Sequence, residues 1–93
     1  MTRAVVFTAR FRRAYHRLHA ADQEVVDHAL RQLAAYLETR HASVGLGVKK
    51  LGPGLYEARA GLALRFVYVE EGPRIVVALL GTHDDVRRFL RQQ

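Results

Sequence analysis

The chain has 93 residues, of which 49% are hydrophobic, and it carries a formal net charge of +6. This length supports one small core, so we expect a single domain over residues 1–93, and the apolar content excludes a disordered basic tail. The absence of cysteine excludes disulfides and thiolate catalysis, and no apolar run approaches the roughly 20 residues of a membrane helix. Because the N-terminal apolar stretch is also too short for a signal peptide, we expect a soluble cytoplasmic protein with no membrane partner.

The first half of the sequence predicts a short strand followed by two helices. Residues 5–7 form an apolar run that predicts an opening strand, and Thr8 can cap the helix after it. Apolar residues then recur at helical spacing over 11–18 and over 26–37, and the second helix is expected to end near Arg40. Since few residues join them, we expect the two helices to be antiparallel neighbours.

The second half changes period, because all seven glycines and both prolines follow residue 44. Residues 55–59 and 62–70 predict two strands joined at Ala60-Gly61, with alternate residues from Leu62 to Tyr68 on one face. The run 75–80 is apolar on both faces, which indicates a central strand.

The C-terminal segment predicts a last helix. Asp84 and Asp85 can start it, and it is expected to continue to Gln93. The predicted order is therefore β-α-α-β-β-β-α, an α+β fold. An antiparallel helical hairpin packs on one face of a small antiparallel-rich sheet, with the opening strand at an edge and the other face partly open.

The positive charge has a distinctive distribution. Thirteen of the fifteen cations are arginine, whose planar fork binds phosphate in bidentate fashion, although the composition of a GC-rich genome explains the ratio equally well. Residues 41–69 carry four cations against one acid, whereas residues 70–93 carry four of each. The middle of the chain is thus almost purely cationic.

Five polar side chains can converge at the ends of neighbouring predicted strands: Lys49, Lys50, Arg59, Arg65 and His83. Cleavage of RNA without a metal needs positive charge around the phosphorus and a group that moves protons at the 2′ and 5′ oxygens. Arginine and lysine supply the charge, and histidine can carry a proton near neutral pH. Because cysteine and metal-type histidine–aspartate spacings are both absent, we expect no metal and no cofactor.

Each of these residues also has a structural interpretation. Arg65 can pair with Glu57 across the hairpin, since buried charges need partners. His83, followed by two aspartates, can belong to a hydrogen-bonded helix start. A lysine pair such as Lys49-Lys50 is usually solvated surface. The residues alone leave these alternatives open.

Four motifs, in this order, resemble those of the RelE/ParE superfamily of bacterial toxin–antitoxin toxins: Phe7-Thr8-Ala9-Arg10-Phe11, Gly54-Leu55-Tyr56-Glu57-Ala58-Arg59, Leu64-Arg65-Phe66-Val67-Tyr68 and Gly81-Thr82-His83-Asp84-Asp85-Val86. The resemblance covers nearly the whole chain. It implies a type II toxin that is a metal-independent endoribonuclease of mRNA in the ribosomal A site and inhibits translation. By this resemblance Arg59 and Arg65 hold the scissile phosphate, and His83 transfers a proton.

The resemblance also implies binding surfaces and partners. Lys49 and Lys50 fall where RelE-like members contact the RNA backbone, and we add Arg13 and Arg87 as candidate RNA contacts. Arg87 stands where the RelE-like ending places a tyrosine. The expected partner is an antitoxin whose acidic or amphipathic segment covers the basic face, and the toxin alone is a monomer or joins a hetero-oligomer with it. The alternatives are a ParE-like inhibitor of DNA gyrase without nuclease activity, and a degenerate toxin that only binds its antitoxin.

Overall fold

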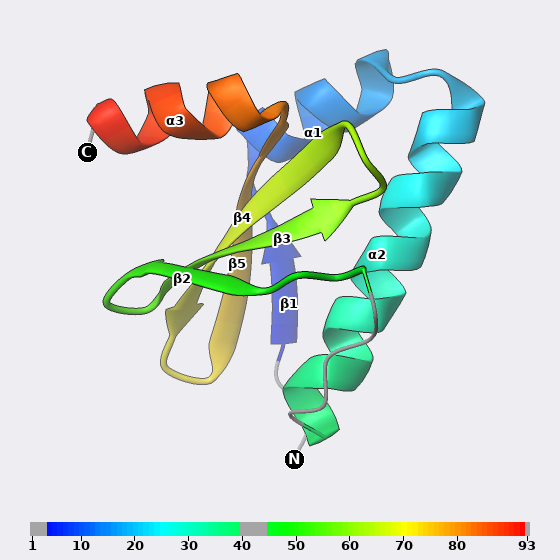
Figure 1. Cartoon of the computed structure of the whole chain (residues 1–93). Coiled ribbons are helices and arrows are strands. Elements are labelled where there is room, and N and C mark those ends of the chain that lie inside the picture. Colours follow the sequence, from blue (N-terminus) through cyan, green and yellow to red (C-terminus); the bar gives the residue numbers. More distant parts are fainter. Residues whose placement is uncertain (1–3, 40–44, 93) are drawn as a thin grey trace.

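Figure 1 shows the computed structural model of the chain, which describes residues 4–39 and 45–92. Within these ranges the chain forms an α+β fold of three helices and a five-stranded mixed sheet. In chain order the elements are β1 (Ala4–Phe7), α1 (Ala9–Arg17), α2 (Ala20–Thr39), β2 (Lys49–Gly52), β3 (Leu55–Ala60), β4 (Leu64–Glu71), β5 (Arg74–Gly81) and α3 (His83–Arg91). None of these helices has the length and apolar character needed to cross a membrane. Arg40 and Gln93, where two helices were expected to end, lie outside the described residues.

The strands are arranged in the order β1-β5-β4-β3-β2. The pairs β2–β3, β3–β4 and β4–β5 are antiparallel, whereas β1 runs parallel to β5. A parallel pair needs a long connection, and here α1, α2 and the three strands between supply it. The predicted positions of the opening strand at an edge and of the run 75–80 inside the sheet are confirmed.

The structure adds one strand that the sequence did not predict. In β2, Lys49 lies opposite Glu57 and Lys50 opposite Tyr56, so the meander has four strands rather than three. The strand is four residues long and begins with two exposed lysines, and at a sheet edge no apolar alternation is required. The turn that follows contains Gly54 at φ 67°, a left-handed conformation that glycine adopts without strain.

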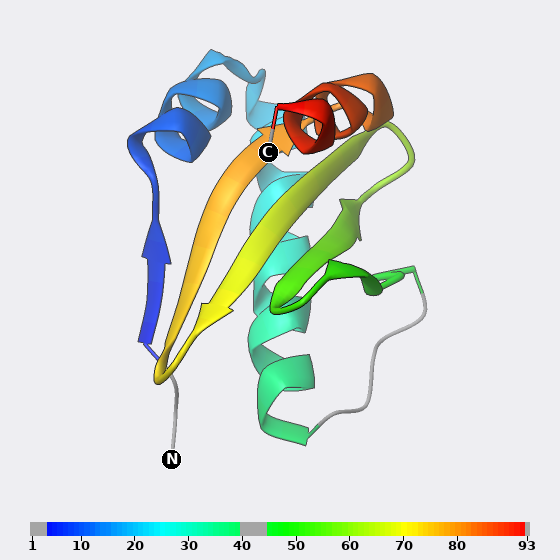
Figure 2. The same cartoon turned by 90° about the vertical axis from the view of Figure 1, so that its left-hand side faces the viewer.

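The helical hairpin of α1 and α2 packs on one face of the sheet. Thr8 caps α1 as predicted, with its hydroxyl accepting a hydrogen bond from the Phe11 N–H at 3.1 Å. Figures 1 and 2 show α2 running along the face while α1 lies across one end of the sheet. The Tyr15 hydroxyl donates to Asp27 at 2.8 Å, and the Gln23 amide donates to the Tyr15 carbonyl at 3.0 Å. These bonds join the two helices.

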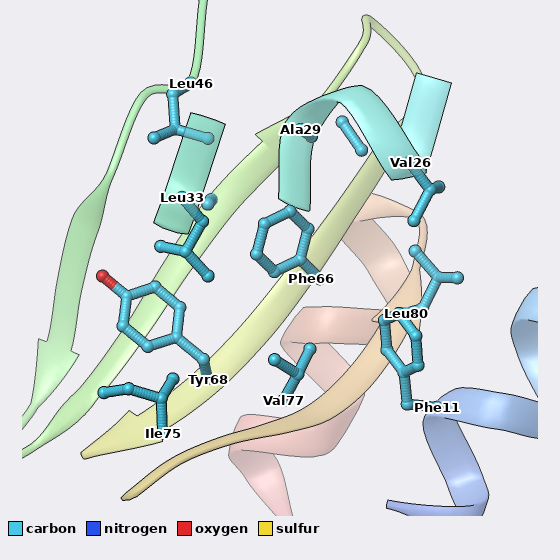
Figure 3. Packing of buried hydrophobic residues seen from close by; sticks show 12 residues of the cluster. Phe11, Val26, Ala29, Leu33, Leu46, Phe66, Tyr68, Ile75, Val77 and Leu80 are labelled. Carbon is cyan, nitrogen blue, oxygen red and sulfur yellow. The ribbon is translucent and has the colours of Figure 1, made fainter. Parts of the chain in front are cut away.

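The main core lies between α2 and the sheet (Figure 3). Val26, Ala29 and Leu33 recur at helical spacing on α2 and are fully or almost fully buried. They pack against Phe66 and Tyr68, two alternate residues of β4 that are also buried. The predicted amphipathic face of the second helix and the predicted alternation in the strand thus meet in one cluster.

A second, smaller cluster lies on the opposite face under α3. Val67, Leu79 and Val86 are its buried members. A bulge in β5 makes this possible, because Ala78 is an extra residue between the pairs Val67–Leu79 and Tyr68–Val77. The Thr8 hydroxyl donates to the Ala78 carbonyl at 2.8 Å and so fixes the bulge to the start of α1.

Leu62 lies outside the strand in which its sequence pattern predicted it. It was expected on the buried face of a strand over 62–70, but β4 begins at Leu64 and Leu62 is fully exposed in the turn before it. The turn spans residues 61–63. Gly61 adopts φ 71° in it, and a Cβ there would lie 2.8 Å from a Val25 methyl group. The left-handed glycine thus lets the turn lie directly against α2.

Candidate functional site

Two arginines lie opposite each other on neighbouring strands. Arg59 of β3 pairs in register with Arg65 of β4, and Arg65 pairs on its other side with Gly81 of β5. Directly paired residues of antiparallel strands direct their side chains from the same face, so both arginines leave their strands on the face away from α2. At the sheet edge Arg59 also lines a pocket whose other wall is α2. His83 follows Gly81 by two residues and is the first residue of α3. Three predicted site residues therefore lie at one end of one sheet face.

The two arginines are held differently. The Nη1 atom of Arg65 lies 2.6 Å from Oε1 of Glu57, whose side chain is only 6% exposed. Arg59 is exposed, and its side chain lies against Gly47 at the outer edge of the sheet, where a Cβ atom would come within 3.2 Å of it. The structure thus contains the ion pair between Arg65 and Glu57 that the structural interpretation of Arg65 predicted.

This ion pair does not remove Arg65 from the site. Its side chain remains 24% exposed, and a guanidinium has five N–H donors of which the bond to Glu57 uses Nη1. Arg65 can therefore hold Glu57 and a phosphate oxygen together. Lys49, directly opposite Glu57, lies on the same face and adds a further positive charge.

The start of α3 is built by Thr82 and Asp85 rather than by His83. The Thr82 hydroxyl accepts from the Asp85 N–H at 3.2 Å, and the Asp85 carboxylate accepts from the Thr82 N–H at 2.9 Å. The backbone hydrogen bond from Thr82 holds the pKa of Asp85 below its usual value. His83 is exposed and is not the capping residue, so its imidazole is available to a ligand.

The other predicted RNA contacts are divided among three places. Lys50 pairs with Tyr56 and so belongs to the opposite face from Lys49, because neighbouring residues of a strand alternate. Arg87 follows His83 by four residues and shares one flank of α3 with it. Arg13 lies on α1, in a groove between α1 and α3. Lys49 therefore shares a sheet face with Arg65, and Arg87 shares a flank of α3 with His83, whereas Lys50 and Arg13 lie elsewhere.

The groove between α1 and α3 is a feature that the sequence analysis did not single out. It has a volume of about 450 Å³ and is lined by four arginines, Arg10, Arg13, Arg17 and Arg88, together with Asp85. The spacing of Arg10, Arg13 and Arg17 was the available signal, because residues three and seven apart share a helix face. Arg88 comes close to these arginines only because of how α3 packs against the sheet, and no local sequence pattern shows that packing.

The described residues also limit metal binding. Across residues 4–39 and 45–92, no three histidine, aspartate or glutamate side chains are grouped so that they could hold a metal ion. Of the described residues discussed above for this face, Lys49, Arg59 and Arg65 are cations and Glu57 is a buried carboxylate, a set that attracts anions.

Comparison with known proteins identifies the fold. No protein-family model matches the chain, and neither does any curated protein sequence. Among solved structures, RelE in the RelE–RelB complex from Pyrococcus horikoshii is similar, with a TM-score of 0.70 and 25% identity over 88% of this chain and 96% of that one. A YoeB/ParE toxin from Agrobacterium tumefaciens matches with a TM-score of 0.64 and 24% identity over 86% of this chain and 98% of that one. The chain has the fold of the RelE/ParE toxin superfamily.

A free form of E. coli RelE with two arginines replaced by alanine extends the likeness. It covers 97% of this chain and 93% of its own length, with a TM-score of 0.69 and 18% identity. The RelE/ParE fold thus accounts for all three helices and the mixed sheet described above. Both the family resemblance and the α+β architecture expected from the sequence are confirmed.

Proposed function

We propose that this chain is the toxin of a type II toxin–antitoxin pair and that it cleaves mRNA on the ribosome. The fold supports the first part, since several of its neighbours are toxins solved in complex with an antitoxin. The second part rests on one observation. Arg59 and Arg65 are paired in register on neighbouring strands and leave them on the sheet face away from α2, and the exposed His83 follows the residue paired with Arg65 by two positions.

This arrangement suits transfer of the phosphorus from the 5′ oxygen to the 2′ oxygen of RNA. The 2′ oxygen forms a bond to phosphorus and loses a proton, while the bond to the 5′ oxygen breaks and that oxygen gains a proton. The pentacoordinate transition state carries extra negative charge, which Arg59, Arg65 and Lys49 stabilise. His83 exchanges a proton with one of the two oxygens, and solvent water exchanges the proton of the other.

Glu57 has a supporting role in this proposal. As a buried acceptor it holds one edge of the Arg65 guanidinium, so that the remaining donors are presented in a fixed direction. It therefore acts as a positioning residue and does not touch the RNA. The net charge of +6 further supports a ribosomal target, since contacts to phosphates supply most sequence-independent affinity for nucleic acid.

Toeprinting on purified translating ribosomes tests the proposal. We expect wild type to cut mRNA in the A site and Arg59→Gln to cut 10²–10³-fold more slowly, roughly the loss caused by removing one donor to a transition-state oxyanion. His83→Ala is expected to be slower by a comparable or larger factor. Arg31→Gln is the matched control, because it removes an exposed arginine on α2, away from the site. Equal cleavage by wild type, Arg59→Gln and His83→Ala would show that the proposed site is wrong.

Inhibition of DNA gyrase is the second candidate, and one observation favours it. Arg87 occupies the position where the RelE-like ending has a tyrosine, and residues 83–93 contain no tyrosine at all. A supercoiling assay separates the two functions. Gyrase inhibition at stoichiometric toxin, together with no cleavage on ribosomes, would replace the nuclease proposal by the gyrase one.

A further inference from the structure

The groove between α1 and α3 concentrates positive charge away from the sheet arginines. Arg10, Arg13 and Arg17 line it from α1, and Arg88 lines it from α3. Asp85 is the carboxylate among its described lining residues, and it accepts a 2.8 Å hydrogen bond from Arg88. Among the described lining residues, four cations and one carboxylate sum to a charge of +3 around about 450 Å³. A concave site of this charge attracts anions strongly.

The two sides of α3 are distinct surfaces. His83 and Arg87 lie on one flank of the helix, and with 3.6 residues per turn Asp85 and Gln92 fall on the other. Asp85 and Gln92 line the groove, whereas His83 and Arg87 do not. The groove is therefore a separate site from the candidate catalytic face, and α3 lies between them.

The arginines of α1 are spaced for a chain of phosphates rather than for one ion. From Arg10 to Arg17 the helix rises by about 10 Å, at 1.5 Å per residue. A stacked nucleic-acid strand carries one phosphate per 3.4 Å of its axis, so this length corresponds to roughly three nucleotides. The Arg10 guanidinium is already positioned by its stacking over the Phe89 ring, 5.6 Å from the ring centroid.

The lining of the groove favours nucleic acid over an acidic peptide. Peptide helices that bind grooves insert apolar anchors, but the apolar residues here are Ala14 and two leucines, Leu79 and Leu80, which are 4% and 5% exposed. What the groove presents is guanidinium groups, whose planar fork matches phosphate oxygens. A space of about 450 Å³ between two helices also admits a single strand more readily than a duplex.

We propose that the groove between α1 and α3 binds the phosphate backbone of single-stranded RNA, as a second site that adds affinity without taking part in cleavage. The proposal rests on the proposed function only in its choice of RNA as ligand. Its geometry is independent of the sheet arginines, so the strand that occupies the groove is a stretch of RNA other than the one being cut.

Fluorescence anisotropy with a labelled 2′-O-methyl oligouridylate of about twelve nucleotides tests the proposal. This probe has an intact phosphate backbone but cannot be cleaved through its 2′ oxygens. We expect Arg13→Gln/Arg17→Gln to bind it roughly tenfold more weakly than wild type. The slope of log affinity against log salt should also become shallower by about 1.4, since each contact with single-stranded phosphate contributes about 0.7.

The matched control is Arg12→Gln/Arg31→Gln. It removes the same charge from exposed positions of α1 and α2 that do not line the groove. Gln92→Lys adds a cation to the groove and is expected to bind more tightly than Ala35→Lys, which adds one to an exposed position of α2. A damaged fold cannot produce this gain. The proposal is overturned if the two arginine pairs weaken binding equally, or if Gln92→Lys binds no better than Ala35→Lys.

Two further binding measurements identify the kind of ligand. The substitution pair Arg13→Gln/Arg17→Gln should weaken binding of an RNA hairpin of equal charge less than it weakens binding of the single strand. An equal loss of affinity for both RNAs would contradict the choice of a single strand. Unlabelled oligoglutamate should compete poorly, and competition equal to that of oligouridylate would assign the groove to an acidic polypeptide instead. Because the probe is not cleavable, these results are unaffected by failure of the nuclease proposal, which the ribosome assay measures separately.

Discussion

The two faces of the sheet differ in what they bury. The face under α2 holds the larger cluster, in which Phe66, Tyr68 and Ile75 are almost fully buried among other apolar groups. Within the described residues, the cluster between the other face and α3 has three buried apolar members, and on that face lie also the Glu57–Arg65 ion pair and the exposed Arg59. Figure 2 shows why, since α2 runs along most of one face while α3 crosses only one end of the other.

This difference separates stability from binding. Apolar burial on the α2 face supplies most of the folding free energy, because each buried side chain contributes about 1.5–3 kcal/mol. The α3 face contributes less and retains charged groups that a core would exclude. Substitutions on the first face should therefore affect mainly unfolding, and exposed substitutions on the second face mainly RNA chemistry.

The largest expected effect on stability comes from Phe66→Ala. Removing a fully buried phenyl ring from the α2 face should cost about 3–5 kcal/mol of unfolding free energy. Val69→Ala, at a half-buried position of the opposite face of the same strand, should cost about 1 kcal/mol. Urea unfolding of both variants measures the two costs. Equal losses would contradict the unequal roles of the faces.

A smaller loss is expected for Glu57→Gln. The variant keeps an acceptor near Arg65 but removes the charge that compensates a partly buried guanidinium, which should cost about 1.5 kcal/mol. Glu71→Gln removes the partner of Arg74 in a pair whose side chains are 55% and 48% exposed, and it should cost less than about 0.5 kcal/mol. If urea unfolding gives the same value for both, Glu57 does not have the role assigned to it.

Thr82→Ala tests the cap of α3. Loss of the hydroxyl that accepts from the Asp85 N–H should lower the unfolding free energy by about 1 kcal/mol. Thr82→Ser keeps that hydroxyl, and it should retain most of the stability in thermal unfolding. A Thr82→Ser variant as unstable as Thr82→Ala would show that packing of the methyl group, rather than the cap, is what matters.

The smallest expected effect is a loss of stability at acidic pH. Because the Thr82 N–H lowers the pKa of Asp85 in the folded state, the ionised carboxylate stabilises the fold above the ordinary aspartate pKa of about 3.9. This contribution is lost as the pH falls through the lower folded value. With a side chain that is 41% exposed, we expect less than about 1 kcal/mol. Wild type should therefore lose its advantage over Asp85→Asn as the pH falls from above the ordinary aspartate pKa to below the lower folded value, and a difference that does not change with pH would contradict this role.

Most of the fold follows from local patterns. Helical spacing of apolar residues predicted the helices, and alternation around Phe66 predicted the buried face of β4, because both signals arise from one-sided burial. Strand β2 was missed because an edge strand with two lysines carries neither signal. The bulge at Ala78 was missed because the Thr8 hydroxyl that fixes it comes from a residue seventy positions away.

The candidate site shows the same limit. Arg59 and Arg65 flank one turn, so a hairpin places them opposite each other and the sequence suffices to pair them. The sequence also suggested an ion pair between Arg65 and Glu57. It could not decide between this pair and a catalytic role for Arg65, because the burial of a side chain depends on tertiary packing. The groove formed by Arg13 and Arg88 lies between helices that are far apart in the chain, and only their packing reveals it.

The most direct test of the division between the two faces compares Arg59→Gln with Arg31→Gln in one preparation of translating ribosomes. Both variants remove an exposed arginine, one beside the α3 face and one on α2, so their thermal stabilities should match that of wild type. We predict that Arg31→Gln cleaves mRNA at the wild-type rate and that Arg59→Gln cleaves roughly 10²–10³-fold more slowly. Equal cleavage rates at equal stability would contradict it.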